Sequence, residues 1–305
     1  MSSACQSPVV SGPSHRRCGT SGLFLSAMGL GLGDGQSPLS QYEPLVGHAL
    51  DLGITHFDIS ADAGSSPDRY TEIGCSLRPW LDWRDEMVIS VRVGLGCGPQ
   101  PLTGFGARKQ ILSSLNGILR RTGLEYVDVL YAHHLDCGTP LEESTGALAS
   151  AVHCGKALYV GLSSFPVQAV RHASVLLSSQ GAAPVAYQGA YSLADRWAED
   201  GVFNTLQDLG MGFVACAPMA RGRLATRPAL RRLAHARGQS AEQVALAWCL
   251  RKPIVASAVT TTSQLPHLMS DHAAVNGPRL SPDDLTDLDL CCPATDRADS
   301  VPGMI

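Results

Sequence analysis

Two pairs of polar side chains stand at the ends of two apolar runs of the chain, where they could form one site. His133 and His134 end the stretch YVDVLYAHHLD, and Ser163 and Ser164 end the stretch GKALYVGLSSF. A histidine titrates near neutral pH and can act as an acid or a base. In a closed parallel barrel the carboxyl ends of the strands lie on one rim, and active sites are built on that rim. The spacing therefore predicts a functional site to which both strand ends contribute.

The apolar runs that would position this site alternate with helical segments along the chain, which predicts βα units and a parallel sheet. The runs are apolar nearly throughout, which is typical of strands covered on both faces. Eight such runs predict an α/β fold of the (β/α)8 TIM-barrel class. The eight runs are Ala27–Leu32, Ile54–Asp58, Met87–Val93, Val127–Ala132, Ala157–Ser163, Val185–Gln188, Gly212–Cys216 and Ile254–Val259.

Helices are expected between these runs, and three of them carry start signals. Leu141–His153 opens with two glutamates, which the positive end of a helix favours. Ser240–Leu250 begins S-A-E-Q, which resembles a capping box. Ser281–Asp289 begins with serine followed by proline, a common N-cap and first helical position. The other expected helices are Ser40–Leu52 and Arg108–Thr122.

A doubly wound Rossmann sheet is the rival α/β architecture, and the run GLGLGDG (29–35) is its signal. No helix opens within the expected few residues and Pro38 follows, so we interpret the run as a barrel strand with its turn. A second glycine run, GLGCG (94–98), is interpreted as a strand-to-helix loop. Residues 1–15 are rich in serine, proline and glycine and are expected to be a disordered tail, and residues 16–305 one barrel domain.

Composition excludes several classes of partner. A net charge of −4 and a pI near 6.2 give no reason to expect nucleic acid or an anionic membrane. No apolar run approaches the ~18 residues of a membrane span, and the N-terminal stretch lacks the apolar region of a secretion signal. The ten cysteines form no metal-binding spacing, so we expect reduced thiols and no metal site. We expect a cytoplasmic protein that acts on a small molecule, and a homo-oligomer is left open.

Seven segments that span nearly the whole chain carry a family resemblance. They are RRCGTSGLFLSAMGLGLG (16–33), DLGITHFDIS (51–60), GLEYVDVLYAHHLD (123–136), GKALYVGLSSF (155–165), YSLADRW (191–197), APMARGRLA (217–225) and RGQSAEQVALAW (237–248). In this order they resemble the aldo-keto reductase family, and most closely the branch of L-glyceraldehyde-3-phosphate reductases and potassium-channel β-subunits. The resemblance implies a barrel that reduces carbonyls with NADPH, using an Asp, a Tyr, a Lys and a His.

The catalytic positions that the resemblance implies are only partly kept. Asp58 matches the family Asp, and His133 matches the family His. Ala63 stands where the family has the tyrosine that donates the proton, and Arg92 stands in place of the lysine. The tetrad is therefore degenerate, because two roles are kept, one is altered and the proton donor is lost.

At the nicotinamide end, the resemblance implies that Ser163, Ser164 and Gln188 hold the carboxamide of the cofactor. Cys216 stands where the family usually has an aromatic residue that stacks on the nicotinamide ring. Ring stacking would therefore be weaker here than in relatives.

At the adenosine end, Ser263 and Asp271 match positions of the loop that follows the last strand. The basic residue that would grip the 2′-phosphate is missing, and Asp271 replaces an asparagine. The stretch from Leu224 to Leu233 is shorter than the excursion with which relatives clamp the cofactor. The expected cofactor is therefore none, or a weakly bound NADP.

These changes alter the chemistry that the site can perform. A positioned proton donor contributes ~10²–10⁴-fold to a reaction such as carbonyl reduction, and Ala63 cannot donate. Arg92 stays protonated but can stabilise an oxyanion, enolate, carboxylate or phosphate. Asp58 can hold Arg92 or act as a base, and His133 can act as acid or base. Such a set suits proton transfer, although Asp58 and Arg92 could also be only a satisfied ion pair.

Four other residues have both a functional and a structural interpretation. His133 could be a packed, hydrogen-bonded histidine, and His134 is expected to point away from it because neighbours on a strand alternate. Tyr70 could replace the missing donor, or it could be an aromatic residue that packs on the following helix. Cys216 could be a site thiol or a small core residue.

Three functions remain open on the sequence. The first is a non-redox isomerase, dehydratase, lyase or cyclase that acts on a small carbonyl metabolite, in specialised biosynthesis. The second is an NADPH-dependent aldehyde or ketone reductase with an atypical tetrad, in which Tyr70 or water donates the proton. The third is a non-catalytic partner subunit.

Overall fold

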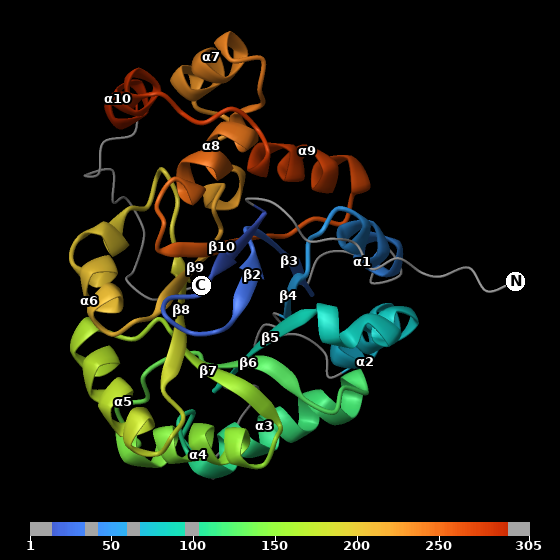
Figure 1. The fold of residues 1–305 in the computed structure, drawn as a ribbon, viewed down its shortest axis with the longest axis vertical. Coiled ribbons are helices and arrows are strands. Elements are labelled where there is room, and N and C mark those ends of the chain that lie inside the picture. The colour runs from blue at the N-terminus through green and yellow to red at the C-terminus, as the bar shows by residue number, and fades with distance from the viewer. Residues whose placement is uncertain (1–13, 34–41, 60–67, 95–103, 292–305) are drawn as a thin grey trace, which may run out of the picture.

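Eight parallel strands form a closed barrel at the centre of the molecule, with helices around it (Figure 1). The structure, a computed structural model, describes residues 14–33, 42–59, 68–94 and 104–291. The strands are β3 (Met28–Leu32), β4 (His56–Ile59), β5 (Val88–Val93), β6 (Val127–Ala132), β7 (Ala157–Ser163), β8 (Pro184–Ala190), β9 (Gly212–Cys216) and β10 (Val255–Thr260). They pair in chain order, and β10 closes the barrel against β3. The predicted (β/α)8 fold is therefore confirmed.

The helices cover the outer face of the barrel, and the main apolar core lies between them and the strands. They are α1 (Tyr42–Asp51), α2 (Asp68–Leu77), α3 (Arg108–Thr122), α4 (Leu141–His153), α5 (Val167–Ser179), α6 (Val202–Asp208), α7 (Pro228–Ala236), α8 (Ala241–Leu250), α9 (Leu265–Val275) and α10 (Pro282–Cys291). Short 3₁₀ segments occupy Arg78–Glu86, Trp197–Glu199 and Ala220–Gly222. None of the helices in the described ranges combines the length and hydropathy that crossing a bilayer requires.

Gly29 and Gly31 of the first run belong to barrel strand β3, as we interpreted them, and their small size serves packing. A Cβ atom on Gly29 would lie 2.8 Å from Nδ1 of His56, and one on Gly31 would lie 2.6 Å from Oγ1 of Thr261. Distances this short exclude any side chain without rearrangement. The glycines therefore let polar groups of neighbouring strands approach β3.

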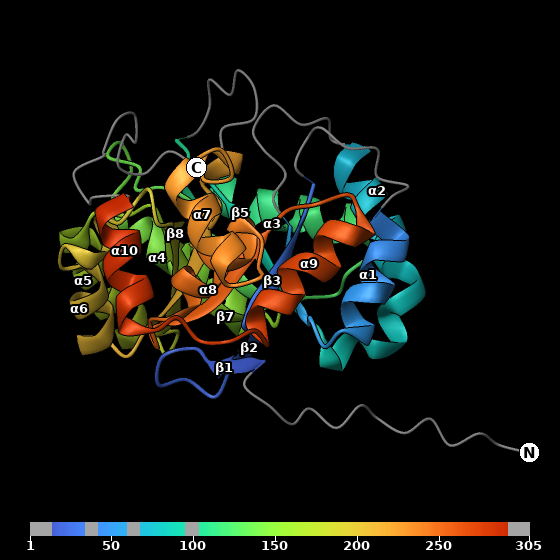
Figure 2. The ribbon, with the colours of Figure 1, turned by 90° about the horizontal axis from the view of Figure 1, so that it is seen from above.

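An antiparallel hairpin that the sequence reading missed closes one end of the barrel. It consists of β1 (His15–Arg17) and β2 (Phe24–Ser26). The guanidinium of Arg16 donates to the carbonyl oxygens of Leu250 and Val255, at 2.7 and 3.0 Å. In Figure 2 the hairpin lies below the barrel. Because His15 already belongs to β1, the expected tail of residues 1–15 is too long at its end; residues 1–13 lie outside the described residues.

A second, smaller apolar cluster fills the barrel interior above this hairpin. Its members come from the hairpin region and from the strands β6, β8, β9 and β10. They are Cys18, Leu23, Leu25, Val129, Tyr131, Val185, Ala186, Val214, Ala256 and Val259. The interior is therefore packed at the hairpin end, and polar side chains are left for the opposite end, where the strands finish.

Candidate active site

The carboxylate of Asp58 joins three strands of the barrel. It lies on β4 with 1% of its surface exposed. Its Oδ1 accepts hydrogen bonds from Oγ of Ser90 at 2.6 Å and from Nε2 of Gln188 at 3.1 Å. Its Oδ2 pairs with Nη2 of Arg92 at 3.4 Å. Ser90 and Arg92 belong to β5 and Gln188 belongs to β8, so one buried acid organises side chains from both sides of the barrel.

The sequence reading missed the inner part of this network, which runs through His56. Its Nε2 lies 3.1 Å from Oγ of Ser90, and its Nδ1 lies 2.9 Å from Oγ of Ser257. Because Ser90 uses its only hydroxyl hydrogen toward Asp58, His56 must donate through Nε2 and accept at Nδ1. Burial lowers the pKa of His56 to about 4, against the opposing effect of the Asp58 charge. His56 is therefore a neutral side chain that links β4 to β5 and β10 by hydrogen bonds.

Arg92 carries the fixed positive charge of the site and is almost fully buried. It stands on β5, opposite Tyr131 of β6 in the strand register. Its charge contributes to lowering the pKa of His133 and opposes the rise in the pKa of Cys216. A buried guanidinium keeps its charge, so the mouth of the barrel has a permanently positive centre beside Asp58.

His133 follows β6 directly, and its amide donates to the carbonyl oxygen of Val93 at 2.9 Å. Burial, the charge of Arg92 and the neighbouring His134 lower its pKa to about 3. Our expectation that it titrates near neutrality is therefore wrong, because a buried imidazole beside a guanidinium resists a second positive charge. Its Nδ1 is buried and has no hydrogen-bond partner among the described residues. His133 is thus a neutral imidazole with a free polar atom.

The expectation that His134 points away from His133 is also wrong. The two ring centroids are 3.9 Å apart, and the rings are tilted by 43°. Strand alternation does not apply here, because β6 ends at Ala132 and both histidines lie beyond it. Burial and the charge of Arg92 lower the pKa of His134 as well. The two histidines therefore form one largely uncharged aromatic pair at the rim.

Ser163, Ser164 and Gln188 meet at the ends of β7 and β8, where Ser163 is the register partner of Gln188. Oγ of Ser163, Oγ of Ser164 and Oε1 of Gln188 are all buried without a hydrogen-bond partner among the described residues. Buried polar atoms are nearly always bonded in folded proteins, so three in one place indicate that a ligand satisfies them. The two hydroxyls can donate and the amide oxygen can accept, which fits the carbonyl and amino groups of a carboxamide such as that of nicotinamide.

Comparison with known proteins shows which family this sequence matches. The sequence model of the Aldo/keto reductase family matches residues 23–292. The chain belongs to this family. It is 34% identical to the L-glyceraldehyde 3-phosphate reductase of Escherichia coli O157:H7 over 315 residues, which cover 90% of this chain and 91% of that protein. It is 29% identical over 317 residues to a potassium-channel β-subunit-like protein of Schizosaccharomyces pombe, and these cover 90% and 92% of the two chains.

Backbone strain marks the same end of this aldo/keto reductase barrel. Ser164, Ala217, Ala220 and Arg221 have φ angles between 49° and 57°, and they are the non-glycine residues with positive φ in the described part of the chain. Side chains in this region of backbone conformation cost free energy on the order of 1 kcal/mol each and cluster at functional sites. All four follow β7 or β9 within a few residues. The strain therefore lies at the rim where Ser163, Ser164 and Gln188 meet.

Cys216 ends β9 directly before this strained turn. Burial raises the pKa of its thiol to about 12, although the charge of Arg92 opposes the rise. Reactive cysteines show the opposite shift, toward a lower pKa. The interpretation of Cys216 as a small buried residue therefore fits better than that of a site thiol.

The structure supplies no replacement for the family phenol among its described residues. Ala63 lies outside the described residues. Tyr70 belongs to α2, and its half-buried ring packs against the main core. Tyr131 belongs to the interior cluster, but burial and the nearby Cys18, Asp58 and Cys216 raise its pKa well above the usual value of a tyrosine. A phenol with a raised pKa is a poor proton donor, so Tyr131 fills space rather than replacing the lost tyrosine.

The residues expected at the adenosine end, Ser263 and Asp271, follow β10 in the chain. Ser263 is half-buried in the turn that leads to α9, and Asp271 is buried on α9. Burial, together with repulsion from Glu242, raises the pKa of Asp271 to about 7, against a lowering effect of Thr260. Asp271, which the resemblance matches to a family asparagine, therefore holds its proton more tightly than an ordinary carboxyl group does.

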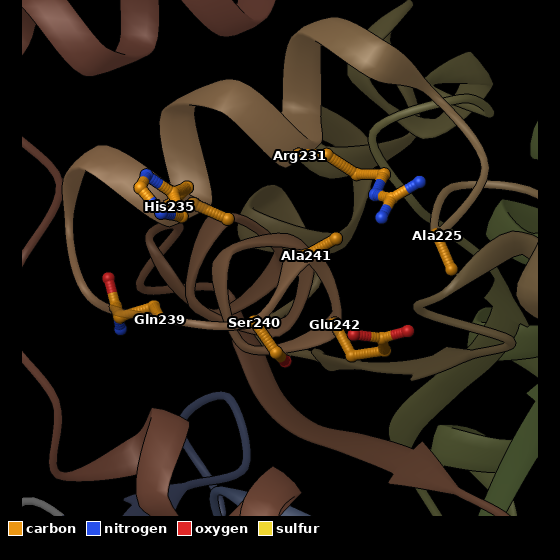
Figure 3. Close-up of a pocket in the computed structure, with 8 residues that line it drawn as sticks. Ala225, Arg231, His235, Gln239, Ser240, Ala241 and Glu242 are labelled. Carbon is orange, nitrogen blue, oxygen red and sulfur yellow. The ribbon is translucent and has the colours of Figure 1, made fainter.

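A separate pocket lies between α7 and the start of α8 (Figure 3), and none of the tetrad positions lines it. Its volume is about 360 Å³. The residues that line it are Ala225, Arg231, Ala234, His235, Gln239, Ser240, Ala241 and Glu242. Within the described ranges, no cluster of three or more histidine, cysteine or acidic side chains is arranged to hold a metal ion.

Proposed function

We propose that this aldo/keto reductase is an oxidoreductase that uses a nicotinamide nucleotide on a small carbonyl compound. The observation that carries the proposal is the set of three buried, unpartnered polar atoms of Ser163, Ser164 and Gln188. Leaving a buried polar group unbonded costs about 1–3 kcal/mol, so a protein that keeps three of them together has a use for them. The carboxamide of nicotinamide satisfies all three.

Asp58 organises both halves of the proposed site. By accepting from Nε2 of Gln188, it orients that amide so that Oε1 remains free for a ligand amino group. By pairing with Arg92, it holds the guanidinium at the mouth. Arg92 then stabilises the negative charge that develops on the substrate oxygen, and neutral His133 adds a hydrogen bond to the same oxygen. A reduced nicotinamide, when bound, supplies the hydride.

This site lacks, among the residues discussed above, a side chain that donates the proton needed by the product alcohol. Ala63 has no acidic hydrogen, Arg92 holds its proton too tightly, and His133 is not protonated near neutral pH. The proton must therefore come from water, and turnover of simple ketones should fall by up to ~10²–10⁴-fold relative to a site with a positioned donor. No step from His133 is expected in the pH dependence of kcat between pH 5 and 8.

A non-redox reaction is the second candidate, and Ala63 together with the buried cation Arg92 favours it. A fixed positive charge stabilises an enolate without any need for hydride, so isomerisation, dehydration, lyase cleavage or cyclisation would suit the same residues. The substrate would again be a small carbonyl-containing metabolite. The third hypothesis, a non-catalytic partner subunit, stays a prediction.

One experiment separates the two candidates. The purified protein is titrated with NADPH and NADH by calorimetry and then mixed with L-glyceraldehyde 3-phosphate, the compound named in the E. coli relative, and with a panel of aldehydes. Micromolar nucleotide binding with one nucleotide oxidised per alcohol formed is the expected result. No nucleotide binding, or a product that forms while the nucleotide stays reduced, would overturn the proposal in favour of the second candidate.

A further inference from the structure

A row of buried polar side chains crosses the barrel interior and ends at Asp58. It starts at Ser257 on β10, where Oγ lies 2.9 Å from Nδ1 of His56 on β4. Nε2 of His56 lies 3.1 Å from Oγ of Ser90 on β5. Oγ of Ser90 in turn donates to Oδ1 of Asp58 at 2.6 Å. The side chains of this row are buried, so its hydrogen bonds are shielded from bulk water.

The hydrogen bonds of this row all run in one direction. Ser90 uses its single hydroxyl hydrogen toward Asp58, so it accepts from Nε2 of His56. A neutral imidazole has one donor and one acceptor nitrogen, so Nδ1 accepts from the hydroxyl of Ser257. The ring stays neutral near pH 7 because burial lowers its pKa to about 4, against the opposing charge of Asp58. Ser257 thus selects the tautomer of His56, and this tautomer makes Ser90 a donor to the carboxylate.

The amide of Gln188 lies at the far end of the same row. Oδ1 of Asp58 accepts from Nε2 of Gln188 at 3.1 Å in addition to the hydroxyl of Ser90. If His56 carried its hydrogen on Nδ1, the hydroxyl of Ser90 would turn toward Nε2 and present a lone pair to Oδ1. The carboxylate would then have to move or take up a proton, and the amide would lose its fixed acceptor. The observed direction therefore leaves Oε1 of Gln188 as the amide atom without a partner among the described residues.

We propose that His56 is a positioning residue that fixes the amide of Gln188 as a hydrogen-bond acceptor for the nicotinamide head of the nucleotide. The inference rests on the proposed use of a nicotinamide nucleotide. An acceptor at this place selects a ligand that carries an N–H group, because a ligand without one leaves a buried oxygen unsatisfied. The site therefore prefers a carboxamide to a methyl ketone of the same shape. His56 produces this preference indirectly, through Ser90 and Asp58.

The test measures this preference as a ratio of two Kd values, obtained by calorimetry with the full chain. The ratio is the Kd of the 3-acetylpyridine analogue of NADP⁺ divided by the Kd of NADP⁺. In the analogue a methyl group replaces the amino group and the charge is unchanged. We expect a ratio of about 10 or more for the unaltered protein, because the analogue leaves Oε1 of Gln188 unsatisfied.

Two substitutions of His56 separate its donor from its bulk. His56→Asn should lower the ratio to about 1–3, because the shorter amide keeps a polar group near Ser257 but no donor for Ser90. His56→Gln should keep most of the ratio, because the longer amide places an N–H group near the position of Nε2. A rescue by glutamine but not by asparagine assigns the effect to the hydrogen bond with Ser90.

Thr122→Val is the matched control for a loss of stability. Thr122 is also buried, and its hydroxyl donates to the carbonyl oxygen of Ile118 at 2.9 Å, on the outer helix α3. This variant should be less stable in urea without any change in the Kd ratio. Ser257→Ala is a second, milder variant for the event that His56→Asn does not fold. It keeps the ring but removes the donor that selects its tautomer, so the ratio should fall about threefold.

The outcomes separate this inference from the proposed function. If NADP⁺ binds but the unaltered protein shows no preference, or if His56→Asn and Ser257→Ala keep the preference, the role of His56 is refuted and the nucleotide proposal stands. If Thr122→Val lowers the ratio as much as His56→Asn does, the effect follows stability and the inference is overturned. If the unaltered protein binds neither NADP⁺ nor NAD⁺, the proposed function falls and this inference falls with it.

Discussion

The rim of the barrel has two halves that differ in how their buried polar groups are satisfied. Both carboxylate oxygens of Asp58 have partners within the protein, namely Ser90, Gln188 and Arg92. Around Ser163 and Ser164, three buried atoms find no partner among the described residues. The first half is built to hold its own geometry, and the second half is built to receive a ligand. Arg92, which the resemblance places at the position of the family lysine, therefore lies in the part of the site whose carboxylate is satisfied without a ligand.

The largest effect on the free energy of unfolding should come from a substitution in the half of the rim around Asp58. Arg92→Met leaves Asp58 buried without its cation, and such losses cost about 3–5 kcal/mol in the free energy of unfolding. Urea denaturation monitored by circular dichroism measures it. Arg92→Lys keeps the charge and is the control, with a much smaller loss. A double variant with Asp58→Asn should recover part of the stability; a stable single Arg92→Met variant would show that the pair does not matter.

Two equally buried serines sharpen the comparison. Ser257 binds Nδ1 of His56, whereas Ser163 has no partner among the described residues. Ser257→Ala should cost about 1–3 kcal/mol of stability, because it leaves the imidazole unsatisfied. Ser163→Ala should leave the stability of the ligand-free protein unchanged and weaken nucleotide binding about tenfold. Equal losses of stability in the two variants would show that the two halves do not differ.

The smallest expected effect on the free energy of unfolding comes from Asp271. Unlike Asp58, this buried acid pairs with no cation among the described residues. Its pKa rises from 3.8 to about 7 on folding. The folded protein therefore holds this proton over a range in which the unfolded chain has released it. The contribution of this protonation to the free energy of unfolding is fully present below about pH 4 and is lost as the pH rises through about 7.

We expect Asp271→Asn to be more stable than the unaltered protein at pH 8, by on the order of 1 kcal/mol, and to lose this advantage near pH 4. Urea unfolding of both proteins at a series of pH values measures the difference. A difference that does not vary with pH would contradict the raised pKa.

The regular parts of the fold were predictable from local pattern. The bounds of β6, β7, β9, α3 and α4 agree with the predicted runs, because apolar periodicity, acidic first turns and glycine stops act locally. The β1–β2 hairpin was missed, because strands of three residues carry too little pattern. The predicted disordered tail therefore extends to residue 15, although His15 belongs to β1.

The site was predictable in its members but not in their electrostatics. Asp58 contacts Arg92 and Gln188, and the charge of Arg92 acts on His133, but their role as one site stays a prediction. The link from His56 through Ser90 joins residues that are 34 positions apart, and the bond to Ser257 joins residues 201 apart, so no local motif announces it. The low pKa of His133 has the same origin, because it results from burial and from Arg92 on another strand.

The shared carboxylate of Asp58 has a thermodynamic consequence. One of its oxygens accepts from Gln188 and the other pairs with Arg92. Ligand binding at either of these side chains is therefore coupled to binding at the other through Asp58. If the first ligand changes the affinity of the protein for the second by some factor, the second ligand must change the affinity for the first by the same factor. A closed cycle of four equilibrium titrations would measure that factor twice.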